Sequence, residues 1–124
     1  MRDEDQALSR LAAKAIGLDL GEYRSGLSSM PDDYLDGFMV GEVGTFGFRG
    51  YYWNPLEHDG DALRLVVALR LDIEFDGPRG VRVNYVDAQG RLCAVEQLVL
   101  DDPVADVRRA IVSAAAEIGE NTHA

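Results

Sequence analysis

The chain has 124 residues, of which 47% are hydrophobic and 27% are charged. This length and composition predict one globular domain spanning residues 1–124 and exclude a disordered chain. Twenty-two acidic residues against 12 basic ones give a net charge of −10, which argues against direct binding to a nucleic-acid backbone.

The cysteine content and the lengths of the apolar runs exclude further classes of protein. The single cysteine, Cys93, excludes an internal disulfide and a cysteine zinc cluster. The sequence has neither the run of about 18 apolar residues of a transmembrane helix nor the opening pattern of a signal peptide. We therefore expect a cytoplasmic protein that does not bind membranes.

The N-terminal part of the chain predicts a helix followed by a loop. The loop is expected over residues 19–37, which carry three glycines and one proline and show no regular apolar period. The helix is predicted over residues 4–17, where four apolar residues share one face at helical spacing, namely Leu8, Leu11, Ala12 and Ala15.

The next segments predict a hairpin and a second helix. Residues 38–40 and 45–48 are typical of two short strands, with a turn near 41–44. A helix is predicted over residues 59–70, and we expect it to be mostly buried because apolar residues cover much of its circumference.

Strictly alternating segments then predict a three-stranded antiparallel meander. Arg82 is expected to lie across from Glu74 or Asp72, where opposite charges stabilise strand pairing. The three segments are residues 71–76, 81–85 and 92–98.

The last predicted element is a helix over residues 103–118, with Asp102 as its N-cap and residues 120–124 as a frayed tail. The element order is thus α-β-β-α-β-β-β-α. We expect an α+β domain, namely a three-layer helix–sheet–helix sandwich with three helices and a mainly antiparallel sheet of four or five strands.

Two blocks of sequence carry a family resemblance. The first is WNPL at residues 53–56 with DGDALRL at 59–65; the second is Asp102–Pro103 with RRAIV and AAAEIG within residues 108–119. Over about residues 50–119 the chain resembles a family of small bacteriophage and prophage proteins, the phage ABA sandwich domain. The resemblance implies a helix–sheet–helix fold and a phage origin, and it implies no catalytic or binding residues.

The densest polar cluster lies just before the second helix. His58 could act as a general base oriented by a carboxylate, or could bind a hard divalent metal together with Asp59 and Asp61. We favour the interpretation that Asp59 or Asp61 caps the helix and stabilises its positive end. The sequence therefore gives no catalytic residue, no metal site and no cofactor.

Aromatic residues offer a second candidate site. Tyr51, Tyr52 and Trp53 could form a recognition patch, since Tyr and Trp anchor many interfaces. For Trp53 we favour a core position, with Asn54 tying the loop to it. The two tyrosines are equally compatible with a surface patch and with the core.

Two adjacent arginines, Arg108 and Arg109, lie opposite the apolar stripe of the last helix. They could grip phosphate or the carboxylates of a partner. Because the chain is so acidic, we favour neutralisation of its own acids, and the candidates are Asp101, Asp102, Asp106 and Glu42.

The leading hypothesis is a phage or prophage accessory protein that binds a host or phage protein without catalysis, in the cytoplasm of the bacterial host. We expect recognition by the loop over 19–37 and the segment 38–52, since loops on a rigid scaffold carry recognition. The candidate binding residues are Tyr34, Tyr51, Tyr52, Trp53, Asn54, His58, Asp59 and Asp61.

Three alternatives remain from the sequence. One is a small-ligand- or metal-dependent enzyme centred on His58, Asp59 and Asp61. Another is an acidic mimic of DNA, although many of the acids lie near helix starts and are explained there by the helix dipole. The third is a homodimer or larger structural assembly that pairs a sheet edge or the last helix.

Overall fold

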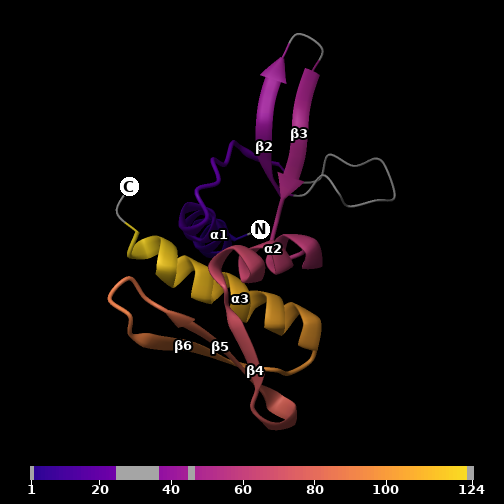
Figure 1. Ribbon diagram of the computed structural model, residues 1–124. Helices are drawn as coiled ribbons and strands as arrows, with labels where there is room; N and C mark the ends of the chain where they lie inside the picture. Colours follow the sequence, from indigo (N-terminus) through magenta and orange to yellow (C-terminus); the bar gives the residue numbers. More distant parts are fainter. Residues whose placement is uncertain (1, 25–36, 45–46, 123–124) are drawn as a thin grey trace.

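The computed structural model describes residues 2–24, 37–44 and 47–122, and the statements below refer to these residues. It is an α+β fold with three helices and two separate antiparallel sheets (Figure 1). The first sheet has the order β1-β2-β3 and the second the order β4-β5-β6. The elements are α1 (Asp3–Ala15), β1 (Tyr23–Arg24), β2 (Gly37–Gly44), β3 (Gly47–Trp53), α2 (Asp59–Leu69), β4 (Asp72–Phe75), a 3-10 turn (Gly77–Arg79), β5 (Gly80–Val86), β6 (Leu92–Leu98) and α3 (Pro103–Glu120).

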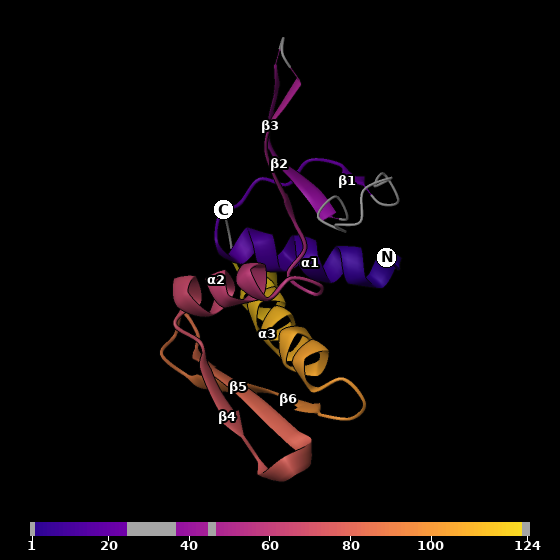
Figure 2. The ribbon, with the colours of Figure 1, turned by 90° about the vertical axis from the view of Figure 1, so that its right-hand side faces the viewer.

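The predicted α+β class, three helices and antiparallel pairing are confirmed, but the strands divide differently. We expected one sheet of four or five strands between helices, whereas the helices lie between two sheets of three strands (Figure 2). The reason is the path of α2, which carries the chain from the end of β3 across the helix layer to β4 on the opposite side.

The hairpin β2–β3 projects from the body of the molecule (Figure 1). Its register pairs Gly44 with Gly47, and residues 45–46 lie outside the described residues. The turn predicted near 41–44 is wrong, because Gly41 lies inside β2 opposite Gly50 of β3. Both glycines have positive φ, 134° and 156°, a conformation that side chains rarely adopt. The hairpin is consequently longer than the sequence indicated.

On one side of the molecule, α1 packs directly against α3. Buried small residues lie on both helices, Ala12 and Ala13 on α1 and Ala115 and Ala116 on α3. At Gly119 the two backbones come so close that an added Cβ would overlap the carbonyl oxygen of Leu11. Small side chains therefore allow the close approach of these two helices.

The second sheet has one apolar face, toward α3, and one charged face, toward solvent. The alternation in β5 buries Val81, Val83 and Tyr85. On the outer face the guanidinium of Arg82 lies 2.9 Å from a carboxylate oxygen of Glu74 on β4 and, equally, of Glu96 on β6. The predicted meander is confirmed, and of the two partners expected for Arg82, Glu74 lies across from it whereas Asp72 lies across from Asn84.

The helix predicted to be mostly buried, α2, is in fact half open to solvent. Ala62 and Leu65 are buried, but the side chains of Leu63 and Val67 are 60% and 64% exposed. The prediction failed because an apolar period does not show whether another element covers each side of a helix, and the described residues leave Leu63 and Val67 largely uncovered.

The predicted start of α3 is confirmed. Oδ1 of Asp102 accepts the N–H of Ala105 at 3.2 Å, and Pro103 takes the first helical position. The helix continues to Glu120, past the predicted end, and residues 123–124 of the expected tail lie outside the described part of the chain. Among the described helices, none is both long and apolar enough to cross a bilayer.

Candidate functional site

The junction between β3 and α2 is buried and fixed by backbone hydrogen bonds. Trp53 and Asn54 are only 1% and 0% exposed, so the core position predicted for Trp53 is confirmed. The Asn54 N–H donates to Oδ2 of Asp61 at 2.9 Å, and the Asn54 carbonyl accepts the His58 N–H at 2.8 Å. These hydrogen bonds join the end of β3 to the start of α2, and the buried side chains of Trp53, Asn54 and Asp61 offer little surface to a partner.

The three polar residues at the start of α2 do not converge. Asp61 turns inward to Asn54, whereas Asp59 accepts a hydrogen bond of 2.7 Å from Nη1 of Arg108 on α3. His58 takes the N-cap position and makes no side-chain capping bond. Neither aspartate is the cap we predicted, because both lie within the first turn, where their charge still favours the helix dipole.

One hypothesis from the sequence was a metal site formed by His58, Asp59 and Asp61. Across the described ranges, no three His, Cys, Asp or Glu side chains come together in a way that could hold a metal ion. The contacts of Asn54 with His58 and Asp61, and of Asp59 with Arg108, join β3, α2 and α3.

The aromatic residues predicted as a recognition patch do not form one exposed surface, because Trp53 is buried and Tyr51 contacts Arg64 of α2. Tyr51 is 42% exposed on β3, and the guanidinium carbon of Arg64 on α2 lies 5.6 Å from its ring centre. This cation–π contact ties the base of the hairpin to α2. Tyr52 is partly buried on the same strand, and Tyr34 lies outside the described residues.

The adjacent arginines of α3 pair with acids of this chain, as favoured from the sequence, but with other partners than predicted. Nε of Arg108 donates to the Leu56 carbonyl at 2.8 Å, in addition to the bond with Asp59. Nη2 of Arg109 donates to Oδ1 of Asp5 on α1 at 2.9 Å. Both arginines therefore join α3 to distant parts of the chain.

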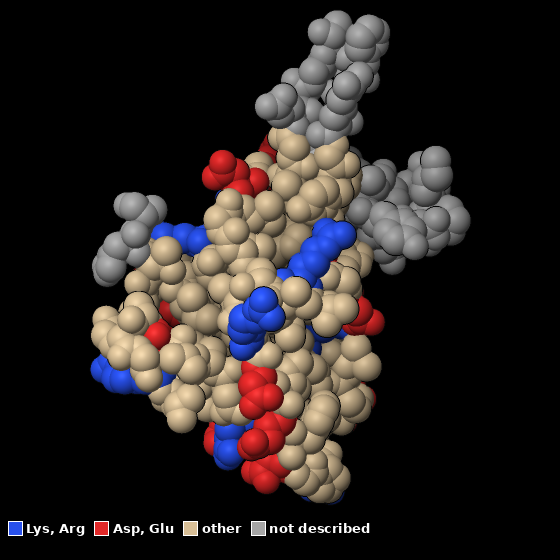
Figure 3. Space-filling model, in the orientation of Figure 1, with Lys and Arg blue, Asp and Glu red and all other residues tan. Residues whose placement is uncertain are grey.

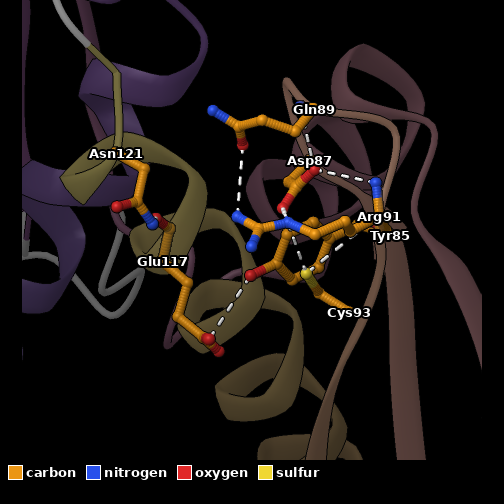
Figure 4. A network of polar contacts seen from close by, with 7 residues as sticks. All are labelled: Tyr85, Asp87, Gln89, Arg91, Cys93, Glu117 and Asn121. Atoms are coloured by element: carbon orange, nitrogen blue, oxygen red, sulfur yellow. Dashed lines mark hydrogen bonds and ion pairs between the residues drawn. The ribbon is translucent and has the colours of Figure 1, made fainter.

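A polar network joins the second sheet to α3 (Figure 4). The Tyr85 hydroxyl donates to Oε1 of Glu117 at 3.3 Å, and burial raises the pKa of Tyr85 above its ordinary value. Asp87 accepts the Arg91 N–H at 2.8 Å, a bond that lowers the pKa of this carboxyl. Sγ of Cys93 lies 3.8 Å from Oδ2 of Asp87. Both shifts favour the ordinary charge states, a neutral Tyr85 and an ionised Asp87, and their contacts stabilise the packing of the sheet on α3 and the turn before β6.

The feature best suited to binding is a groove between α2, β4 and the first turns of α3, hereafter the α2–β4–α3 groove. Its volume is about 450 Å³. Phe75 and Val104 at its sides are 65% and 54% exposed. The main apolar lining residues are Leu63 and Val66 of α2, Ile73 and Phe75 of β4, and Val104 and Val107 of α3.

Charged groups surround this apolar groove. The ion pair of Asp59 and Arg108 contributes to its lining, and these are the charged residues among those that line it. In Figure 3, acidic side chains gather over β4, with a basic side chain among them and a tan surface at the first turns of α3 beside them. The groove is thus apolar within and acidic along one side.

This groove could not be predicted from the sequence because its residues come from three separate elements of the chain. Leu63, Ile73 and Val107 each fit the apolar period of their own element, which predicts core positions. The signal that could have revealed it was the unusually wide apolar surface of the helix over residues 59–70.

No protein-family model, curated protein or solved structure matches this chain. The chemistry of the site must therefore be argued from its own residues.

Proposed function

We propose that this chain is a non-catalytic protein-binding module that holds a segment of a partner protein in the α2–β4–α3 groove. The observation that carries this proposal is the exposure of Leu63, Phe75 and Val104 around one apolar groove. Contiguous exposed apolar surface with a polar rim is typical of protein-interaction sites. We therefore propose the groove as the binding surface, in place of the segments 19–37 and 38–52 that were expected from the sequence.

The setting we propose is a bacteriophage or prophage accessory protein in the cytoplasm of the bacterial host. The resemblance of residues 53–65 and 102–119 to the phage ABA sandwich family supports this origin. The net charge of −10 favours a partner with a basic binding segment.

Two matched variants of α2 test the groove. Leu63 lines it, whereas Val67, one helical turn further, does not, although the two side chains are similarly exposed. We expect Leu63→Glu to weaken partner binding about a hundredfold, because a carboxylate would have to be buried in the complex. Val67→Glu, which introduces the same charge on the same helix, should leave binding unchanged.

The experiment is affinity capture from host-cell lysate with the wild type and both variants, with circular dichroism as a check of folding. The proposal predicts a protein retained by the wild type and by Val67→Glu and lost with Leu63→Glu. Retention of the same proteins by folded Leu63→Glu, or no retention by the wild type, would contradict it.

A further inference from the structure

One wall of the α2–β4–α3 groove is formed by β4, a strand at the edge of its sheet. β4 is an edge strand, because the sheet order is β4-β5-β6. The Asp76 N–H donates to the Gly80 carbonyl on the β5 side at 2.9 Å. Since backbone groups alternate in direction along a strand, the N–H and C=O of Ile73 and Phe75 point away from β5. Leu71, in the same phase, donates its N–H to Val66 of α2 at 3.0 Å.

The backbone groups of Ile73 and Phe75 on this edge have no hydrogen-bond partner among the described residues. Their side chains meanwhile line the groove. An extended segment placed here would satisfy these groups and fill the groove with alternate side chains. A helix would fill the groove but would leave the edge unpaired, because its own backbone groups are already bonded.

The outer face of this edge is acidic. Asp72 and Glu74 alternate with Ile73 and Phe75 and are exposed on the face away from α3, and exposed Asp76 follows them. Figure 3 shows acidic side chains gathered over this strand. Pairing β4 with the same strand of a second copy would bring like charges together, which destabilises strand pairs. Lysine or arginine opposite Asp72 and Glu74 would instead form favourable cross-strand pairs.

We propose that β4 accepts a basic, extended segment of a partner protein as the fourth strand of this sheet. The segment alternates apolar side chains, which enter the groove, with lysine or arginine side chains, which lie along the acidic outer face. This inference rests on the proposed function and specifies the chemistry of its partner.

The probe is a short capped peptide in which lysine and valine alternate. A peptide of the same composition, with all lysines at one end and all valines at the other, is its control. We expect saturable binding of the alternating peptide by titration calorimetry, about tenfold tighter than that of the block peptide. Equal binding of the two peptides, or none, would overturn the proposal.

Glu74 and Glu96 provide a matched pair within the protein. Both side chains are exposed, and Oε1 of each lies 2.9 Å from a guanidinium nitrogen of Arg82. Glu74 lies on β4, whereas Glu96 lies on β6 at the opposite edge of the sheet. Glu74→Lys should weaken peptide binding about tenfold, because attraction across the new strand pair becomes repulsion. Glu96→Lys makes the same change in net charge and should leave binding within about twofold. Equal losses would show non-specific attraction and overturn strand addition.

Amide hydrogen exchange separates strand addition from other occupants of the groove. On binding, the amides of Ile73 and Phe75 should become protected, since strand addition gives them partners. If Leu63→Glu abolishes binding but these amides stay unprotected, the groove binds in another way: strand addition is overturned while the proposed function stands. A dimer of the wild type in light scattering that Leu63→Glu abolishes would identify a second copy as the occupant of the groove and also overturn it.

Discussion

The two ends of α3 pack in opposite ways. Its C-terminal half meets α1 at Gly119, carries buried small residues such as Ala116, and is closed. Its N-terminal half carries Val104 and Val107 and faces α2 and β4 across an open groove of about 450 Å³. Small side chains bring two helices into contact, whereas larger ones over a three-stranded sheet leave apolar surface that nothing in the described chain covers.

We infer that the closed half of α3 mainly stabilises the fold and that the open half mainly serves binding. The closed half is expected to supply most of the free energy of folding, because its residues are fully removed from water. The open half contributes little to folding and leaves its apolar surface available for a partner.

The largest expected difference concerns two phenylalanines. Phe38 is fully buried near α1, with the guanidinium carbon of Arg10 4.7 Å from its ring centre, whereas Phe75 is 65% exposed at the groove. Phe38→Ala should lower the free energy of unfolding by about 3–5 kcal/mol. Phe75→Ala should lower it by less than about 1 kcal/mol, since little area is lost from the core. Urea denaturation measures both, and similar losses would contradict the contrast.

A pair of helical glycines should give effects of opposite sign. At Gly119 a Cβ would overlap the Leu11 backbone, while at Gly60 of α2 it would meet nothing within 4 Å. Gly119→Ala should destabilise the fold by about 2 kcal/mol, because the two helices must separate. Gly60→Ala should stabilise it by up to about 0.5 kcal/mol through the better helix propensity of alanine. Denaturation midpoints check the signs, and an unchanged midpoint for Gly119→Ala would refute the close contact.

The smallest effect concerns the contact of Tyr85 with Glu117, which joins the second sheet to the closed half of α3. The pKa of Tyr85 is raised above 10.0 in the folded state, chiefly by burial, so the folded protein holds this proton more tightly than the unfolded chain. The free energy of unfolding should therefore fall as pH rises above about 10. Tyr85→Phe should cost about 1 kcal/mol at neutral pH through the lost hydrogen bond.

Because Tyr85→Phe cannot ionise, its stability should lack this part of the alkaline decline, and the gap to the wild type should narrow above pH 10. Denaturation curves of both proteins between neutral and alkaline pH test this. A gap of constant size would show that the pKa of Tyr85 is not raised.

Local pattern predicted the elements of this fold well. Alternation gave the meander and the pairing of Arg82 with Glu74, and capping chemistry gave the start of α3 at Asp102. The glycines of the hairpin led to a wrong prediction of its turn, because Gly41 and Gly50 lie opposite each other inside the strand pair.

The site itself could not be read from local pattern. An apolar period shows which residues share a face but not whether another element covers that face, so Leu63 and Val104 were indistinguishable from core residues. The partners of Arg109 and Arg108, which are Asp5 and Asp59, depend on the packing of α3 against two other helices, and this too lies beyond periodicity.

The most direct test of the account is a methyl chemical-shift map of the wild type with the alternating lysine–valine peptide. The account predicts shifts at Leu63, Ile73 and Val104 around the groove, with the alanine methyls between α1 and α3 unchanged. Shifts confined to the hairpin β2–β3, or spread evenly over the acidic surface, would contradict it.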